Sequence, residues 1–225
     1  MAGKLNGPTR AKADPRRPGP ASGRSVVREY AEALIIAVLL ALVIRTFVVQ
    51  AFKIPSGSML PTLQIGDHIL VNKFVYAFRP VRRGDIIVFK FPQDESRDFI
   101  KRVIGLPGET VEIRGTQVLI NGRPLSEPYA VYSDSSLVRS LERDRLGPLQ
   151  VPPGHLFMMG DNRDHSLDSR VWGFLDQAKV KGQAFIAYFS VRSEDIPYDA
   201  AIPSVGYVLI HPSLIRWSRI GRLVS

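Results

Sequence analysis

One segment of this sequence constrains the fold more than any other. Residues 33–44, with the sequence ALIIAVLLALVI, are apolar without interruption, and after Arg45 and Thr46 a second apolar stretch, FVVQAF, begins. As a helix, residues 33–52 would be about 30 Å long at 1.5 Å per residue, which is the thickness of the hydrocarbon core of a bilayer. The sequence therefore predicts one N-terminal transmembrane helix over residues 29–52.

Arg45 opposes this interpretation, because a cation at the centre of a bilayer costs about 2.5–3.5 kcal/mol on insertion scales. It lies in the second half of the segment, from where its side chain can extend toward the far interface. Two alternatives are a buried core helix and the apolar part of a cleaved signal peptide. No small-x-small cleavage site follows directly, and the run exceeds the 7–15 apolar residues that are typical of a signal peptide.

The charge distribution predicts the orientation of this helix. The 225-residue chain has a net charge of +9, and seven of its 30 Lys and Arg residues precede residue 29. Basic residues collect on the cytoplasmic side of membrane spans, so the N-terminus is predicted to be cytoplasmic and the remainder extracytoplasmic. Residues 1–28 are poor in large apolar side chains and rich in Gly, Pro and basic residues, which predicts a disordered basic cytoplasmic tail.

Residues 53–225 have the pattern of a mainly β domain. Short β-prone runs, among them HILVNKFVY, DIIVFKF, TVEIRG and QAFIAYFS, are separated by Gly and Pro. Asn121 and Gly122 predict a tight turn between two runs, because both residues accept positive φ. Residues 109–153 predict a small cap excursion, and residues 206–225 predict a final strand with a basic tail. The chain has no cysteine, which excludes disulfides, thiolate metal sites and a cysteine nucleophile.

A serine-containing loop follows the predicted helix directly. Residues 54–63, IPSGSMLPTL, place two prolines and a glycine around Ser56 and Ser58. Such a loop is rigid, as a nucleophile held in one orientation requires. The alternative is that Ser56 or Ser58 is a helix N-cap.

A serine nucleophile needs a base, and the sequence favours lysine over histidine. The Gly-x-Ser-x-Gly motif is absent, and no triad signature surrounds the four histidines, His68, His155, His165 and His211. Lys101 lies in a strand-like stretch where alternation places it between Phe99 and Val103. Burial there would lower its pKa and make the amine a usable base. The alternative is a solvated basic pair of Lys101 and Arg102.

A third segment, residues 160–170, is dense in hydrogen-bonding groups: GDNRDHSLDSR. A metal site built from Asp161, Asp164, His165 and Asp168 is one interpretation. The calcium-loop pattern fails, because Arg163 stands at a ligand position and no glycine follows at the sixth position. We predict no metal, and a structural turn network of Asp and Arg pairs is the alternative.

Taken in order, these segments resemble the bacterial type I signal peptidases. The resemblance is carried by five blocks: IPSGSMLPTL at 54–63, GDHILVNK at 66–73, RGDIIVF at 83–89, FIKRVIGLPG at 99–108 and GDNRDHSLDSR at 160–170. It implies an antiparallel β-sheet catalytic domain over residues 53–225, outside the cytoplasmic membrane. Because the excursion between Lys101 and Gly160 is short for the family, we expect a reduced cap over residues 109–153.

The resemblance also implies the residues of a catalytic site. Ser58 would be the nucleophile, Lys101 the general base, and Ser56 would join the Ser58 backbone N–H in an oxyanion hole. Ser166 would orient the lysine, and Asp168 and Arg170 would form a supporting ion pair. His165 stands where relatives often have Asn.

The same resemblance implies substrates and partners. The substrates would be exported preproteins, cut after small residues in the Ala-x-Ala style, and the protein would act at the membrane lipid as a monomer. It would need no cofactor and bind no nucleic acid. One rival is a self-cleaving Ser–Lys repressor peptidase, which would need a DNA-binding helix-turn-helix in place of residues 1–50. The other rival is a membrane-anchored envelope-binding protein without catalysis.

Overall fold

The computed structural model describes residues 26–43, 48–133, 145–195, 208 and 210–224. The chain divides into two compact units, Met1–Leu42 and Val43–Ser225, and the second unit contains every described strand. Of the tail predicted over residues 1–28, only residues 26–28 fall within the described part, and they belong to a helix.

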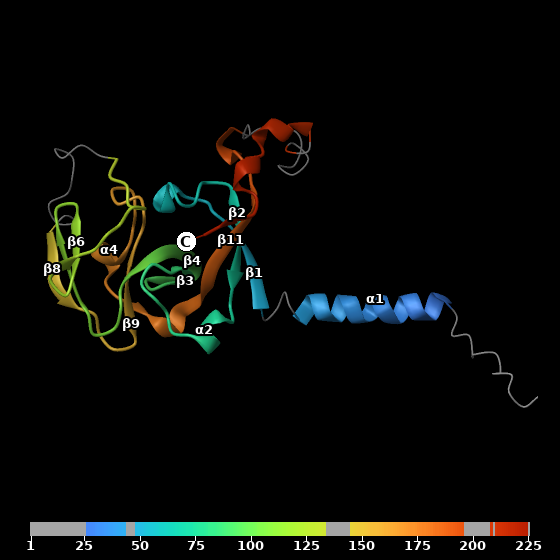
Figure 1. Ribbon diagram of the computed structural model, residues 1–225, viewed down its shortest axis with the longest axis horizontal. Coiled ribbons are helices and arrows are strands. Elements are labelled where there is room, and N and C mark those ends of the chain that lie inside the picture. The colour runs from blue at the N-terminus through green and yellow to red at the C-terminus, as the bar shows by residue number, and fades with distance from the viewer. Residues whose placement is uncertain (1–25, 44–47, 134–144, 196–207, 209, 225) are drawn as a thin grey trace, which may run out of the picture. The chain divides into compact units, whose positions relative to one another are not determined.

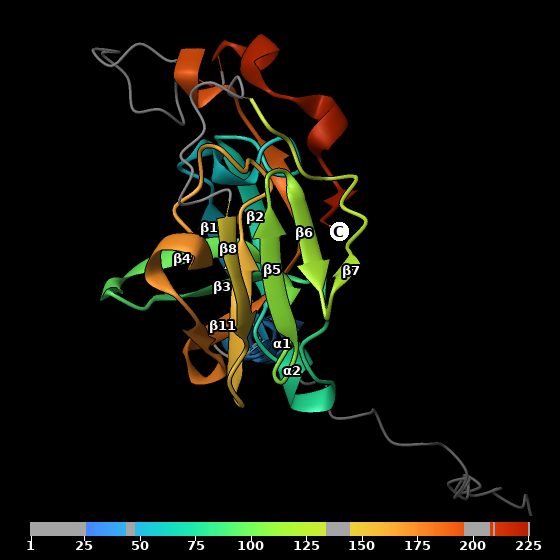
Figure 2. The ribbon, with the colours of Figure 1, turned by 90° about the vertical axis from the view of Figure 1, so that its left-hand side faces the viewer.

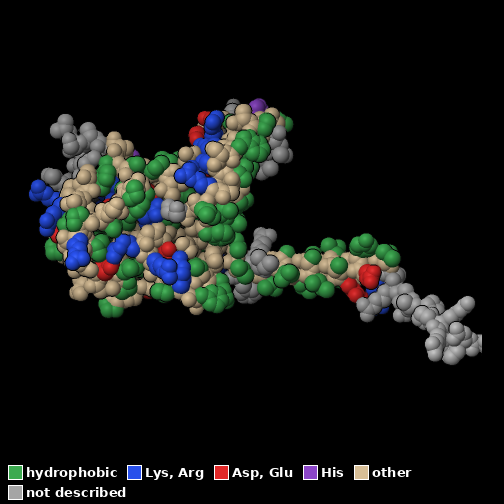
Figure 3. Space-filling model, in the orientation of Figure 1, with side chains coloured by type: hydrophobic (Ala, Val, Ile, Leu, Met, Phe, Trp, Pro, Cys, Tyr) green, Lys and Arg blue, Asp and Glu red, His purple; other side chains and the backbone are tan. Residues whose placement is uncertain are grey.

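The first helix, α1, has 18 residues and extends over Val26–Val43. None of its residues is buried, and Figure 3 shows apolar side chains along it. Arg28, Glu29 and Glu32 lie in its first two turns. Among the described residues, no helix reaches the length and apolar content that a membrane crossing requires.

The helix predicted over residues 29–52 is wrong at its C-terminal end. Residues 44–47 lie outside the described part, and Val49–Lys53 form strand β1. β1 pairs along its whole length with β2, Asp67–Asn72, in antiparallel register. A stretch rich in Val and Phe fits a strand as well as a helix. The hydrogen bonds that β2 offers to β1 favour the strand.

An eight-stranded antiparallel sheet is the centre of the second unit (Figure 1). Its strands lie in the order β1-β2-β11-β3-β4-β9-β10, and β12 pairs with β11. The remaining bounds are β3 Ile86–Phe91, β4 Asp94–Gly105, β9 His155–Met159, β10 Leu175–Asp176, β11 Val180–Ser190 and β12 Arg222–Leu223. The prediction of a mainly antiparallel β fold is confirmed.

A second antiparallel sheet lies within the region where the sequence predicts a cap, residues 109–153 (Figure 2). Its order is β7-β6-β5-β8, with bounds β5 Thr110–Arg114, β6 Gln117–Ile120, β7 Arg123–Pro124 and β8 Arg145–Gln150. The predicted tight turn joins β6 to β7, with φ of 51° at Asn121 and 74° at Gly122. Residues 134–144 of this excursion lie outside the described part.

Short helical turns connect the strands. They are α2 Val75–Phe78, α4 Ser169–Trp172, and the 3-10 turns η2 Gly57–Met59, η3 Gln177–Lys179, η4 Ser193–Asp195, η5 Pro212–Leu214 and η6 Trp217–Arg219. Each has only three or four residues. These turns cannot be stable alone, so the sheets must supply most of the packing.

Three apolar clusters fill the second unit. The first packs residues of β2, β3 and β11 against the serine loop, and it contains Ile54, Met59, Leu63, Ile69, Val71, Ile86, Val88, Ala184 and Ala187. The second lies between the small sheet and β9, and the third lies around Ile87, Phe89, Val103, Leu156, Met158 and Leu175. The serine loop is thus part of the core.

A buried ion pair joins the C-terminal segment to the main sheet. Arg219, from η6, binds Asp67 at the start of β2, with the two side chains 6% and 0% exposed. Ser190 donates to the same carboxylate at 2.6 Å. Removing one partner of a buried pair leaves the other charge without compensation.

We expect Asp67→Ala to lower the free energy of unfolding by about 3–5 kcal/mol, because it leaves Arg219 buried and unpaired. Urea unfolding followed by tryptophan fluorescence would measure the change. Lys181→Ala, which breaks a partly exposed pair with Asp98, is the matched control and should change stability little. Equal losses of unfolding free energy in the two variants would contradict the conclusion that the buried pair contributes more to stability than the partly exposed pair.

Candidate active site

Ser58 lies in the turn η2, which follows β1 after a short loop. Buried side chains fix the loop at both ends, since Ile54 and Met59 are 2% and 0% exposed. The backbone N–H of Ile54 also donates to the carbonyl of Asp67 at 2.8 Å. The packing therefore holds Ser58 in one place, as predicted from the prolines and glycine of this segment.

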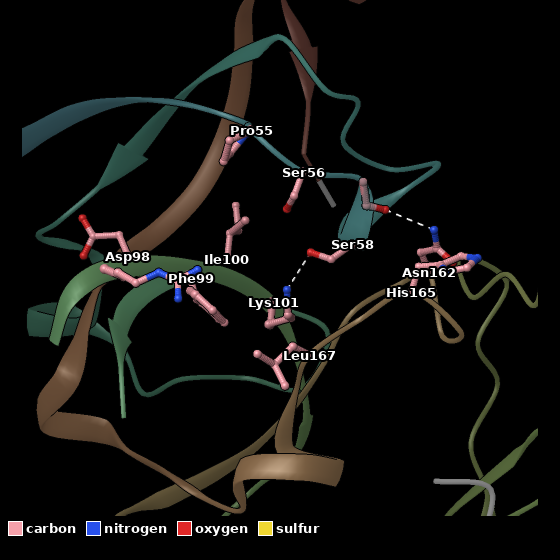
Figure 4. Close-up of a pocket in the computed structure, with 12 residues that line it drawn as sticks. Pro55, Ser56, Ser58, Asp98, Phe99, Ile100, Lys101, Asn162, His165 and Leu167 are labelled. Atoms are coloured by element: carbon pink, nitrogen blue, oxygen red, sulfur yellow. Dashed lines mark hydrogen bonds between the residues drawn. The ribbon is translucent and has the colours of Figure 1, made fainter. Parts of the chain in front are cut away.

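Lys101 reaches Ser58 from the main sheet. In β4 it lies opposite Ile87 of β3, and it is 4% exposed. Its Nζ lies 2.6 Å from the Oγ of Ser58. Figure 4 marks this hydrogen bond with a dashed line. The two residues are 43 positions apart in sequence, so the contact depends on the fold.

Burial lowers the pKa of the Lys101 amine from 10.5 to about 8. Asp168 and Asp161 act in the opposite direction, and Arg170 acts in the same direction, but burial dominates. Near pH 8 a large fraction of the amine is therefore neutral and can accept a proton. The alternative of a solvated Lys101–Arg102 pair is wrong, because both side chains are buried.

Arg102, the next residue in β4, forms a two-pronged ion pair with Asp161. Its Nε and one terminal nitrogen each donate to a carboxylate oxygen at 2.8 Å. Thr62, which follows the serine turn, donates to the same carboxylate at 2.5 Å. Asp161 therefore ties β4 to the serine segment.

The loop over residues 160–163 contacts the serine turn directly. The backbone N–H of Asn162 donates to the carbonyl of Ser58 at 3.1 Å, and its side-chain amide donates to the carbonyl of Gly57 at 3.2 Å. Figure 4 shows the second of these bonds. Asn162 therefore fixes the orientation of the turn that carries Ser58.

Gly160 permits this close approach. A Cβ at position 160 would lie 2.3 Å from the Oγ of Ser166 and 2.5 Å from the carbonyl oxygen of Ser58. Both distances are far below van der Waals contact, so any side chain would push the loop away from the serine turn. The glycine is explained by crowding at the site.

The supporting residues suggested by the resemblance lie near Lys101. Asp168 and Arg170 form a buried ion pair, with hydrogen bonds of 2.9 Å from Nε and one terminal nitrogen. Burial opposes ionisation of Asp168, but Arg170 holds the pKa of this carboxyl below its usual range. Ser166 is 3% exposed, and within the described residues no hydrogen bond joins its Oγ to Lys101.

Ser58 and Lys101 open into a cleft of about 770 Å³. Residues from three parts of the chain line it: Pro55, Ser56, Gly57, Ser58, Arg97, Asp98, Phe99, Ile100, Lys101, Asn162, His165 and Leu167. Ser56 is exposed and makes no capping hydrogen bond, although it stands at the N-terminus of η2. Ser56 therefore occupies the N-cap position, as the alternative interpretation expects, but its side chain does not cap the turn.

The sequence matches the family model described as signal peptidase, peptidase S26, over residues 27–189. The chain belongs to this family. A signal peptidase I of Leptolyngbya laminosa is 43% identical over 176 residues, covering 75% of this chain and 82% of the relative. A signal peptidase I of Aquifex aeolicus (strain VF5) is 34% identical over 254 residues, covering 87% of this chain and 98% of the relative.

Among solved structures, a crystal structure of a signal peptidase I from Enterococcus faecalis V583 is 40% identical in sequence. The match covers 47% of this chain and 97% of that chain, with a TM-score of 0.39. As a member of the signal peptidase family, the chain is a serine peptidase and thus a hydrolase.

The sequence of this signal peptidase family member did not predict two contacts, those of Asn162 and Tyr129. Asn162 lies inside the 160–170 segment, but nothing in the sequence indicates that it binds the serine turn 105 positions away. The ring of Tyr129 lies 3.9 Å from the guanidinium of Arg102. The only available signal was the density of polar residues in the 160–170 segment.

The lowered pKa of Lys101 predicts a pH-dependent stability. In the unfolded chain the amine has its ordinary value of 10.5, so between about pH 8 and 10.5 the unfolded state binds more protons than the folded state. Stability conferred by this group therefore rises with pH in that window.

We expect Lys101→Met to be more stable than the wild type below pH 8, by up to about 3 kcal/mol, because burial of the cation is avoided. The advantage should shrink as the pH rises from 8 to 10.5. Urea unfolding of both proteins at several pH values would measure it. A difference that stays constant across this range would contradict the lowered pKa.

Proposed function

We propose that this protein is a membrane-bound serine endopeptidase that removes signal peptides from exported preproteins, with Ser58 as nucleophile and Lys101 as general base. The observation that carries the proposal is the 2.6 Å distance between the Lys101 amine and the Ser58 hydroxyl, at the wall of an open cleft. Membership of the signal peptidase family supports the class of substrate.

The first half of the reaction follows from this geometry. The neutral amine of Lys101 takes the proton of Ser58 as Oγ attacks the carbonyl carbon of the scissile bond. A new C–O bond forms, and the carbonyl oxygen becomes an oxyanion. When this intermediate collapses, the C–N bond breaks and the Lys101 ammonium gives its proton to the leaving amine. The products are an acyl ester on Ser58 and a released peptide amine.

The second half uses the same two residues. Water attacks the ester carbonyl while the Lys101 amine accepts one of its protons. Collapse of the second intermediate breaks the C–O bond to Ser58, returns that proton to Ser58 and releases a carboxylic acid, which loses its own proton to solvent. Each oxyanion would accept hydrogen bonds from the Ser56 hydroxyl and the Ser58 backbone N–H, which bind charge that develops only in the transition state.

We assign supporting roles to three neighbours. The charges of Asp168 and Arg170 act in opposite directions on the pKa of Lys101. The two charges of this ion pair partly offset each other, and burial remains the largest influence on the amine. Ser166, whose side chain is buried near Asp168, is suited to accept or donate a hydrogen bond during the reaction.

One edge of β4 offers an extended peptide a place to bind. β4 pairs with β3 through residues 94–102, but with β9 only from Arg102 onward. Residues 97–101 line the cleft along the edge that β9 leaves open. A substrate strand that pairs with this edge would gain main-chain hydrogen bonds and run toward Ser58.

We propose that the cleft next to Ser58 accepts small substrate residues. Pro55, Phe99 and Ile100 supply apolar surface along the β4 edge. Shallow apolar sites select small substrate residues mainly because large side chains are excluded sterically. We therefore propose cleavage after Ala-x-Ala sequences.

The first helix is the proposed membrane anchor. Between residues 33 and 43 it has no charged residue, and none of its residues is buried against protein. A helix that is apolar on all sides needs an apolar partner surface, which lipid provides. Because Val49 begins β1, we place the end of the anchor before that residue.

This anchor gives the proposed arrangement of the chain. The basic tail would lie in the cytoplasm, and the peptidase unit would lie on the outer side of the cytoplasmic membrane. Ser58 follows β1 by five positions, so the site would stay close to the bilayer. Preproteins still held in the membrane by their own apolar segments would meet it at high effective concentration.

We expect Ser58→Ala and Lys101→Arg to abolish cleavage of a synthetic preprotein in detergent. The first removes the attacking oxygen, and the second replaces the base with a guanidinium that cannot lose its proton. Gel analysis of the products, with mass spectrometry of the new N-terminus, would measure cleavage and its position.

The matched controls are Ser96→Ala and Lys90→Arg, which make the same changes on the exposed β3–β4 hairpin. Both should cleave like the wild type. Cleavage by Lys101→Arg at near the wild-type rate would show that the base is another residue. A folded wild-type protein that cuts no preprotein would favour the envelope-binding alternative.

A further inference from the structure

The largest fully buried side chain in the described residues is that of Arg163, at 0% exposure. It belongs to the loop over residues 160–163, which contacts the serine turn, but the proposed chemistry does not use it. Burying a guanidinium costs several kcal/mol unless its charge and its N–H groups are satisfied. The groups that bind Arg163 therefore indicate what its side chain does in this protein.

Glu127 is the main partner. Its two carboxylate oxygens accept hydrogen bonds from both terminal nitrogens of Arg163, at 3.0 and 2.5 Å, and its side chain is only 7% exposed. The Nε of Arg163 donates to the carbonyl of Gly160 at 3.1 Å, and a terminal nitrogen donates to the Tyr132 hydroxyl at 3.1 Å. The Arg163 guanidinium thus links Glu127 to Gly160, the first residue of the loop that contains Arg163.

Backbone bonds join the same two segments. The N–H of Val131 donates to the carbonyl of Asp161 at 2.8 Å, and the N–H of Arg163 donates to the carbonyl of Val131 at 2.9 Å. We call residues 127–132 the brace. Through these bonds the brace runs beside the loop over residues 160–163, with Val131 opposite Asn162.

The brace also contacts the strand that carries the proposed base. The ring of Tyr129 lies 3.9 Å from the guanidinium of Arg102, the residue next to Lys101. Arg102 in turn holds Asp161 of the loop. The brace therefore contacts both the loop over residues 160–163, which binds the serine turn, and strand β4, which carries Lys101.

A continuous set of contacts runs from the brace to the nucleophile. Glu127 holds Arg163, Arg163 holds its own loop through Gly160, and Asn162 of that loop binds the carbonyl groups of Gly57 and Ser58. Gly160 itself lies so close to Ser58 that no side chain fits between them. A shift of the loop would therefore move the serine turn.

We propose that Glu127 is a positioning residue for peptide cleavage: through Arg163 it holds the loop over residues 160–163 so that Ser58 stays within reach of Lys101. The inference rests on the proposed function in taking Ser58 as the nucleophile. It gives the reduced cap region a part in catalysis in addition to its part in folding.

If Glu127 served only to stabilise the fold, a different result would be expected. The stability that the ion pair gives can be separated from the direction of the hydrogen bonds that it makes. A buried ion pair can often be replaced by apolar residues of similar size without loss of stability. Such residues cannot direct a hydrogen bond to the carbonyl of Gly160. If Glu127 positions the loop, an apolar pair should restore stability but not the rate.

The experiment compares three variants of the full chain in detergent with the wild type: Glu127→Gln, the double variant Glu127→Met with Arg163→Met, and Glu112→Gln. Glu112, which pairs with the exposed Arg114 in the small sheet, is the matched control. The readouts are the thermal midpoint and the separate values of kcat and KM on a preprotein. Ser58→Ala is measured in the same assay.

We expect Glu127→Gln to lower both the thermal midpoint and kcat. The double variant should regain the midpoint while kcat stays on the order of 10-fold to 100-fold below the wild type, because small displacements of reacting groups have effects of that size. KM should change less than about twofold, since the β4 edge is untouched. Glu112→Gln should behave like the wild type.

Recovery of both kcat and the midpoint in the double variant would overturn the proposal, and so would a double variant that does not fold, since the pair would then serve folding. Unchanged kcat in Glu127→Gln would overturn it as well. Cleavage by Ser58→Ala would instead remove the proposed function, which distinguishes the two failures.

Discussion

The burial of one lysine amine beside one serine hydroxyl is the constraint on which the rest of this structure depends. Lys101 is placed inside the main sheet, where burial lowers the pKa of its amine to about 8, and its Nζ lies 2.6 Å from Ser58. Burial disfavours the cation, so the neutral form that a base requires is more populated than in an exposed lysine. The core on both sides of the serine turn keeps the two groups together.

Buried ion pairs hold the loops around Ser58 and Lys101 in place. Arg102, Arg163 and Arg170 each bind a carboxylate, and all three side chains are at most 4% exposed. Each cation is paired with a carboxylate, and burial remains the largest influence on the pKa of the Lys101 amine. The pairs of Arg102 with Asp161 and of Arg163 with Glu127 connect segments far apart in the chain, which helps a domain without disulfides to hold the loop over residues 160–163.

The sequence was most informative where a local pattern matches a local structure. Alternation around Lys101 predicted a strand, and Asn121 with Gly122 predicted a turn, and both were found. The pairing of Lys101 with Ser58 came only from the family resemblance, because alternation places a side chain on a face but not opposite a given partner. The apolar stretch through residue 52 fitted both helix and strand, and pairing with β2 decided it. The contact between Glu127 and Arg163 has no local signal at all.

The proposed chemistry requires a Lys101 amine that is neutral at a pH where an ordinary lysine is charged. An NMR titration of the lysine side chains in the intact, isotopically labelled protein, with Lys101→Met used to assign the signal, measures this directly. We expect a midpoint near pH 8 for Lys101. A midpoint near 10.5, the ordinary value, would contradict it.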